Sequence, residues 1–324
     1  MANQLITVII PVKNEVNRIK SIIENLLAQT YRPIEVLFVD GGSTDGTCEL
    51  VEKLAKMHSS ELFQVKLLKE GDYGPLRSPA NARNIGVMNS RGNYIAFFDA
   101  DFELTDRDVI KKVVERLRQS EHVAIRYVPN MHTWIEKSLA LDDMIYYFNG
   151  NKPVHMACAF KRGIFNWATF DATLGFHEDM EFLSRVGTRP VIVDSEVKRC
   201  YPHTLREFLK QQLWYGRTAL RYYRKAGQKS WLLKVVRSNA ILGLLTLSIL
   251  FSFFFSVMLT LIPIGIAMLI ITRRWLRKDI KLFGANVKLL ERLLWLTIRE
   301  ILGRLFFDVG LLEALIKKRV ELGR

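Results

Sequence analysis

Acidic side chains follow two apolar runs in the N-terminal part of the chain. Asp40 comes directly after residues 34–39 (IEVLFV), and Asp99 and Asp101 come after residues 93–98 (NYIAFF). Alternation along an extended chain would turn the carboxylates of Asp99 and Asp101 to the same side, where they repel each other unless a cation is shared. Hard oxygen ligands suit Mg²⁺ or Mn²⁺, and such a metal would hold a phosphate. The spacing predicts a metal and phosphate site, although Asp40 alone is also typical of a turn.

Glycine-rich phosphate loops of the common kinds are absent from the sequence. No Gly-x-x-x-x-Gly-Lys-Ser/Thr run occurs, and no Gly-x-Gly-x-x-Gly follows the first apolar run. We therefore expect the metal and a basic group such as Arg83 to hold the phosphate.

Apolar runs and helical patterns alternate around these acids. Residues 5–12 (LITVIIPV) are typical of a strand that is buried on both faces of a parallel sheet. Ile and Leu then recur at helical spacing from Glu15 to Gln29, with Asn14 as the expected N-cap. Further strands are predicted at 34–39, 63–69 and 93–98, and helices at 47–58, 80–90 and 178–187. The series predicts a doubly wound α/β sheet, which binds ligands at the carboxyl ends of its strands.

Composition excludes several classes of protein. Of the 324 residues, 49% are hydrophobic, which is too many for a disordered chain. The three cysteines show neither disulfide nor metal spacing. The net charge is +14, but residues 231–324 hold 15 Lys+Arg against 6 Asp+Glu and carry most of that excess. Because the basic groups gather at one end beside an apolar segment, we expect a membrane and not nucleic acid as the partner.

Residues 239–272 form a run of 34 residues without a charged side chain. One straight helix of this length would measure about 51 Å, well beyond a hydrocarbon core of about 30 Å. Ten basic groups lie within residues 199–237, and four more lie within 273–278. Both flanks then favour the cytoplasm, which a transmembrane hairpin over residues 231–278 satisfies. A single tilted span is the alternative.

Residues 281–318 mix Leu, Ile, Phe and Trp with spaced charges. The pattern favours amphipathic helices at a membrane interface, with a pair of soluble core helices as the alternative. The chain does not open on a charged segment followed by an apolar stretch, so we expect a multi-pass protein of the cell membrane whose soluble part lies in the cytoplasm. The predicted organisation is an α/β domain over residues 1–230, a hairpin over 231–278 and interfacial helices over 279–324.

Four short motifs occur in the α/β part. They are IPVKNE at residues 10–15, VDGGSTDGT at 39–47, ARNIG at 82–86 and FDAD at 98–101. In this order and spacing they resemble the motifs of family 2 glycosyltransferases, over roughly residues 5–225. Further along, His177-Glu178-Asp179 resembles the Glu-Asp motif of that family, and QQLWYGR at residues 211–217 resembles its acceptor-side helix.

The resemblance implies a GT-A fold, a UDP- or GDP-sugar donor, a Mn²⁺ or Mg²⁺ ion and inversion at the anomeric carbon. Carried over by position, the donor-binding residues would be Pro11, Asn14, Glu15, Asp40, Arg83 and Asp99. The metal ligands would be Asp101, Asp99 and His203. The acceptor-binding residues would be His177, Glu178, Trp214 and Arg217. Asp179 would be the general base that takes the proton of the acceptor hydroxyl, with its pKa raised by the neighbouring Glu178.

Two of these assignments have a plain structural alternative. Acids such as Glu178 and Asp179 are also favoured at the start of a helix by the macrodipole. His203 follows Pro202 in a basic stretch, so it is either a third metal ligand or a surface group near lipid.

We expect an enzyme that moves one sugar from a nucleotide donor to a hydroxyl of a lipid-linked polyprenyl acceptor at the cytoplasmic membrane face. One alternative is transfer directly onto a polyprenyl phosphate, as in dolichyl-phosphate mannose synthases, which needs no base. A nucleotidyltransferase, which would release pyrophosphate, and a non-catalytic membrane scaffold are two others. The sequence leaves open which nucleotide, sugar and acceptor are used.

Overall fold

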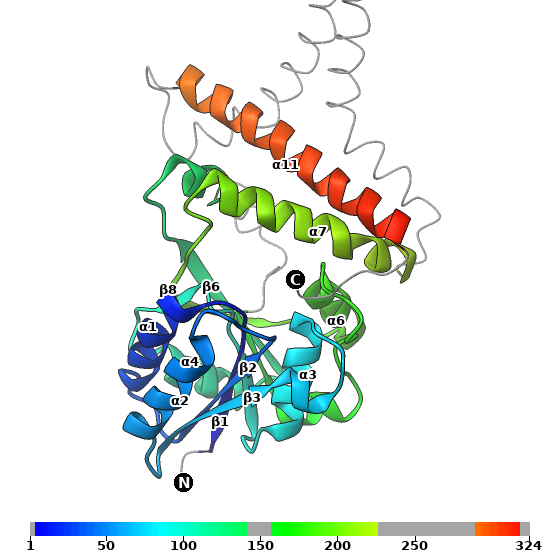
Figure 1. Ribbon diagram of the computed structural model, residues 1–324. Coiled ribbons are helices and arrows are strands. Elements are labelled where there is room, and N and C mark those ends of the chain that lie inside the picture. Colours follow the sequence, from blue (N-terminus) through cyan, green and yellow to red (C-terminus); the bar gives the residue numbers. More distant parts are fainter. Residues whose placement is uncertain (1–3, 141–156, 226–288, 318–324) are drawn as a thin grey trace, which may run out of the picture. The chain divides into compact units, whose positions relative to one another are not determined.

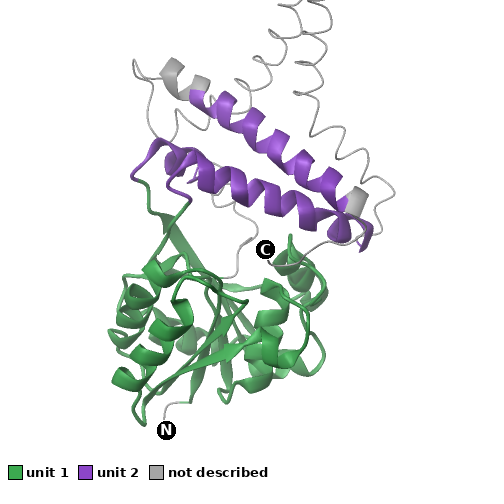
Figure 2. Ribbon diagram, viewed as in Figure 1, with its two compact units in different colours: residues 1–131, 150–201, 321–324 green, residues 132–149, 202–320 purple. Residues whose placement is uncertain are grey.

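The computed structural model of the protein describes residues 4–140, 157–225 and 289–317. The chain divides into two compact units (Figure 2). Unit 1 comprises residues 1–131, 150–201 and 321–324, and unit 2 comprises residues 132–149 and 202–320.

The predicted membrane hairpin over residues 231–278 lies outside the described residues. Within the described ranges, no helix is long and apolar enough to cross a membrane. The hairpin therefore stays a prediction.

Unit 1 is built on a mixed sheet, which confirms the α/β prediction (Figure 1). Within its described residues the sheet has eight strands in the order β3-β2-β1-β4-β7-β6-β8-β5. The strands are β1 (Ile6–Val12), β2 (Ile34–Asp40), β3 (Phe63–Lys69), β4 (Tyr94–Phe97), β5 (Phe102–Leu104), β6 (His122–Pro129), β7 (Cys158–Lys161) and β8 (Val191–Arg199). The helices are α1 (Val16–Leu27), α2 (Thr47–His58), α3 (Pro79–Asn89), α4 (Val109–Leu117) and α6 (Glu178–Val186), with short 3-10 helices η1 (Glu70–Tyr73) and η2 (Arg162–Asn166).

Strands β3, β2, β1 and β4 run parallel, and β7 pairs with β4 in the antiparallel direction. Every residue of β2 is buried, as expected for a strand that is covered on both faces. Helices α1, α2 and α4 cover one face and α3 and α6 the other (Figure 1). Because β1 and β2 pair in register from Ile6–Ile34 to Val12–Asp40, the loops that follow these strands leave the sheet at one edge.

Helix α3 lies very close to strand β1. A Cβ atom added to Gly86 would stand 2.4 Å from Cγ2 of Ile9, a buried core residue. Glycine at this position therefore lets the helix backbone approach the sheet. Asn84, on the same helix, donates a hydrogen bond to the carbonyl of Phe170 and accepts one from the amide of Phe170. These contacts fix the helix that carries Arg83.

Two long helices, α7 (Leu205–Lys225) and α11 (Leu289–Lys317), form most of the described part of unit 2. They pack along each other, and a Cβ atom at Gly216 of α7 would fall 1.9 Å from the carbonyl oxygen of Phe307. One face of α11 is buried, whereas its exposed residues include Trp295, Leu305, Val309 and Leu312. Of the predicted interfacial segment, residues 279–324, the structure describes this single helix.

The close approach of α3 and β1 gives a test of the fold. Replacing Gly86 by Val should lower the free energy of unfolding by about 1–3 kcal/mol, because the added methyl groups overpack the contact with Ile9. Urea denaturation followed by circular dichroism measures the change. Gly163→Val is the control, since a Cβ at Gly163 has no neighbour within 4 Å among the residues that the structure describes. Equal stability of the two variants would contradict the close packing.

Candidate active site

Asp99 and Asp101 lie in a turn directly after β4. The amide of Phe102 donates to the carbonyl of Asp99 at 3.2 Å, so this segment is not the extended chain on which the sequence prediction of a shared direction rested. The two carboxylates bind different arginines. Asp99 Oδ1 accepts from Arg83 Nη2 at 2.6 Å, and Asp101 Oδ2 accepts from Arg199 Nε at 3.3 Å. The acids still influence each other, because the charge of Asp99 helps to raise the pKa of Asp101.

Asp101 has the strongest features of a metal ligand in this turn. Its Oδ1 is buried and has no hydrogen-bond partner among the described residues. Burial raises the pKa of this carboxyl, and the guanidinium of Arg199 opposes that rise. A buried carboxylate oxygen without a donor is costly unless a cation completes it, so the site fits a divalent metal.

No group of three or more His, Cys, Asp and Glu side chains within the described ranges could hold a metal by itself. This is compatible with Mg²⁺-type sites, which commonly use one or two carboxylates and take further ligands from water and from substrate phosphates. Asp99 keeps 38% of its side chain exposed and stands beside Asp101, so it is available as the second carboxylate.

The segment after β1 contributes a third ion pair to this edge. Glu15 precedes α1 and accepts from Arg18 Nη1 at 2.8 Å. Burial raises the pKa of Glu15, Arg18 lowers it, and the negative charge of Asp101 adds to the rise. A charge on the segment after β4 therefore affects the pKa of a residue on the segment after β1. This is expected, because the carboxyl ends of neighbouring parallel strands lie at the same edge of the sheet.

Asn14 joins the loops after β1 and β2. Asn14 has a left-handed backbone (φ 58°), its amide donates to Ser43 Oγ, and its Oδ1 accepts from the amide of Thr44. The expected N-cap role of Asn14 is wrong, because α1 begins at Val16 and the amide of Val16 instead donates to Asp45 Oδ2.

The carboxylate of Asp40 is a turn acceptor, bound by the amides of Gly42 at 2.9 Å and Ser43 at 3.1 Å. The turn role considered for this residue is therefore present. The donor-binding roles of Pro11, Asn14, Glu15 and Asp40 stay predictions, with Pro11 half-buried in β1.

Arg83 connects this edge to helix α6. Its side chain is 2% exposed, with Nη2 bound to Asp99 and Nη1 bound to Glu178 Oε1 at 2.7 Å. The guanidinium of Arg83, which we predicted to contact a diphosphate, is thus already bound to two carboxylates.

His177, Glu178 and Asp179 lie at the start of α6. His177 has a left-handed backbone (φ 55°), and its ring stacks on Phe176 at a centroid distance of 3.7 Å. Glu178 is buried, and burial raises its pKa against the effect of Arg83. The carboxylate of Glu178, which we predicted to contact the acceptor, is therefore paired with Arg83 and only 11% exposed. Asp179 is half-buried, and its Oδ1 accepts from the amide of Met180.

Three other predicted residues, Trp214, Arg217 and His203, belong to unit 2. Arg217 Nε donates to Glu313 Oε2 at 2.7 Å, which joins α7 to α11. Trp214 packs on Tyr215. The ring of His203 contacts the buried carboxylate of Glu136. The acceptor role of Trp214 and Arg217 and the metal role of His203 stay predictions.

Two arginines of the site were not among the predicted residues. Arg18 stands three positions after Glu15, and this helical spacing of opposite charges was a usable signal. Arg199 reaches Asp101 from a position 98 residues away in the chain, which no local pattern indicates.

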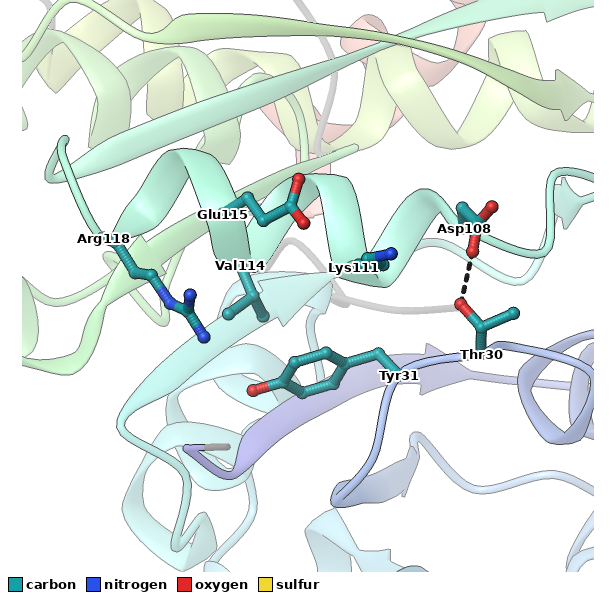
Figure 3. Close-up of a pocket in the computed structure, with 7 residues that line it drawn as sticks. All are labelled: Thr30, Tyr31, Asp108, Lys111, Val114, Glu115 and Arg118. Carbon is teal, nitrogen blue, oxygen red and sulfur yellow. Dashed lines mark hydrogen bonds between the residues drawn. The ribbon is translucent and has the colours of Figure 1, made fainter. Parts of the chain in front are cut away.

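A pocket of about 440 Å³ lies elsewhere in unit 1 (Figure 3). Its lining includes Thr30 and Tyr31, which precede β2, and Asp108, Lys111 and Arg118 from the region of α4. None of the predicted site residues lines it. The candidate active site is therefore the acidic edge after β1, β2 and β4.

Part of the chain is similar in sequence to known glycosyltransferases. The chain is 36% identical over 118 residues to an uncharacterized glycosyltransferase of Rickettsia felis, a match that covers 36% of this chain and 18% of that protein. It is 32% identical over 119 residues to the glycosyltransferase GlyA of Streptococcus pneumoniae, covering 36% of this chain and 16% of GlyA. The chain thus matches less than a fifth of the length of these relatives.

Among solved structures, the fold is similar to that of the mannosyltransferase PcManGT of Pyrobaculum calidifontis, which was determined in complex with GDP-Man and Mn²⁺. The TM-score is 0.59 at 18% sequence identity, and the match covers 98% of this chain and 89% of that one. The model of the glycosyl transferase family 2 matches residues 7–169, which include β1, β2, β4 and the acids that follow them. The chain therefore belongs to glycosyl transferase family 2 and carries a glycosyltransferase domain.

Proposed function

We propose that this protein transfers a sugar from a nucleotide-sugar donor to an acceptor hydroxyl, with inversion and with the help of a divalent cation. The observation that carries the proposal is the acidic edge of unit 1, where Asp101 stands beside Asp99 and keeps a buried carboxylate oxygen without a hydrogen-bond donor in the described part of the chain. The family membership supports glycosyl transfer as the reaction at that edge.

Charge also supports a cation at this site. Four ion pairs there join three arginines (Arg18, Arg83 and Arg199) to four acids (Glu15, Asp99, Asp101 and Glu178). Asp179 and Asp45 influence the pKa values of this group and add further negative charge. The acids therefore outnumber the arginines, and a divalent ion would offset their excess negative charge.

The donor class is inferred from the same acids. A metal held by Asp101 and Asp99 would be completed by the oxygens of a diphosphate, which is the leaving group of a nucleoside-diphosphate sugar. The similar mannosyltransferase holds GDP-Man with Mn²⁺, which agrees with this inference. We propose a UDP- or GDP-sugar as the donor and Mn²⁺ or Mg²⁺ as the ion.

The chemistry divides between two groups of residues. A bound cation would stabilise the charge that develops on the departing diphosphate. Asp179, half-buried at the start of α6, would accept the proton of the acceptor hydroxyl as the oxygen bonds to the anomeric carbon and the bond to the phosphate oxygen breaks. General base catalysis of this kind typically contributes about 10²–10⁴-fold to the rate.

We further propose a lipid-linked polyprenyl acceptor at the cytoplasmic face of the cell membrane. The support comes from the sequence, where the uncharged residues 239–272 are preceded by nine basic groups within residues 206–237. This count leaves out Arg199, which pairs with Asp101. Basic groups near a membrane surface attract anionic lipids by about 1 kcal/mol each. Transfer to a polyprenyl phosphate is the second candidate, which the same basic flank would also favour.

Asp179→Asn tests the reaction type. The variant should lower kcat for transfer to a hydroxyl by at least about 100-fold, because the amide cannot accept the proton. The measurement is release of nucleoside diphosphate, with mass spectrometry of the lipid product. Asp194→Asn is the control. Asp194 is an exposed acid on β8 that pairs with Arg126 on β6. Substantial residual activity of the Asp179 variant would point to transfer onto a phosphate.

Asp101→Asn tests the metal site. The affinity for Mn²⁺ in the presence of UDP or GDP should fall at least about tenfold, the lower limit for loss of even an outer partner of a metal site. Isothermal calorimetry measures this affinity without turnover, again with Asp194→Asn as the control. An unchanged Mn²⁺ affinity would place the cation, if one binds, on other residues.

A further inference from the structure

Arg83 occupies a special place between the two halves of the candidate site. It lies on α3, yet its partners come from the turn after β4 and from the start of α6. Nη2 donates to Asp99 at 2.6 Å and Nη1 donates to Glu178 at 2.7 Å. Since the guanidinium is planar and rigid, these two short bonds hold the two carboxylates at a fixed separation.

Arg83 and Glu178 are buried, so water cannot easily replace the ion pair between them. The side chain of Arg83 is 2% exposed, and its remaining donor, Nε, is buried without a hydrogen-bond partner among the described residues. Only 11% of the side chain of Glu178 is exposed. Water therefore has little access to either group, so the loss of one partner would leave a buried charge poorly compensated.

The backbone around Arg83 is fixed as firmly as its side chain. Gly86 brings α3 against β1, and Asn84 bonds both the amide and the carbonyl of Phe170. Ser78, the N-cap of α3, donates to the carbonyl of Ala172. The helix is thus tied on one side to the sheet and on the other to the segment that leads into α6.

Asp179, the proposed base, directly follows Glu178. The acids Asp99 and Asp179 also act on one common neighbour, since both help to raise the pKa of the Cys158 thiol, which burial raises most. Cys158 pairs with Phe97 at the end of β4. Both acids therefore influence the same buried thiol, and Arg83 binds the two segments that carry them.

We propose that Arg83 and Glu178 are positioning residues that hold the proposed base, Asp179, at a set distance from the donor-side acid Asp99. The proposal rests on the proposed function and deepens it. It differs from a donor-binding role of Arg83, because a buried guanidinium with two carboxylate partners acts on the geometry of the site and leaves the nucleotide to other groups.

The test compares Arg83→Lys with Glu178→Gln. Lysine keeps the charge but loses the two-pronged geometry, and glutamine keeps the shape but loses the charge. Each variant should lower kcat by about 100-fold, as expected for a displacement of about 1 Å at the reacting groups. The affinity for UDP or GDP with Mn²⁺, measured by calorimetry, should change by less than about threefold in Glu178→Gln, because Glu178 contacts neither proposed metal ligand. Arg83→Lys also removes the partner of Asp99, so in that variant the affinity should fall together with kcat. The double variant should lose little more than either single one, since both break the same link.

Arg91→Lys is the matched control. Arg91 also binds a fully buried carboxylate, Glu35, at 2.7 Å, but Glu35 lies near the amino end of β2, at the opposite edge of the sheet. This control should keep the kcat of the wild type. Thermal unfolding of all variants confirms that each is folded before its rates are compared.

The possible outcomes distinguish a failure of the positioning role from a failure of the proposed function. Wild-type kcat in both Arg83→Lys and Glu178→Gln would overturn the positioning role alone. A large fall in nucleotide affinity with unchanged kcat would overturn it too and would make Arg83 a donor ligand. A wild-type protein that releases no nucleoside diphosphate with any UDP- or GDP-sugar and acceptor would overturn the proposed function, and the positioning role with it.

Discussion

A buried guanidinium that is shared by two carboxylates is the constraint around which the candidate site is arranged. Arg83 carries one positive charge, whereas Asp99 and Glu178 bring two negative ones within 2.7 Å of it. Removing one partner of such a buried ion pair typically costs about 3–5 kcal/mol, because the other charge is left without solvent. The three elements that supply these residues, α3, the turn after β4 and α6, are therefore held in one arrangement.

The same constraint distributes the chemistry over the edge of the sheet. Asp99 is bound to Arg83 through one oxygen and keeps 38% of its side chain exposed. Asp101 is bound to Arg199 and keeps a buried oxygen for which the described residues provide no donor. Glu178 is bound to Arg83. Of the two neighbouring acids, the half-buried Asp179 is therefore the one left for a ligand. Two neighbouring acids in each motif thus have different environments, and environment decides which of them is available to a ligand.

Much of unit 1 was predictable because its signals are local. The apolar runs at residues 5–12 and 34–39 and the helical spacing after Glu15 predicted the elements that the structure confirms as β1, β2 and α1. Alternation of side chains assumes an extended chain, so it did not predict the turn at Asp99–Phe102, which a backbone hydrogen bond closes. Asn14 likewise resembles an N-cap in the sequence, but the loop after β2 provides the acceptors for the amides at the start of α1.

The sequence by itself determined the family, the α/β alternation and the acids at the strand ends, because each depends on residues that are close together in the chain. Only the tertiary structure decided the partners of those acids. Arg83 meets Glu178 across 95 positions, and Asp101 meets Arg199 across 98. Contacts of this range depend on how strands and helices pack, so no spacing in the chain indicates them. Folding therefore decided which arginine each acid meets and which carboxylate oxygen is left for a cation.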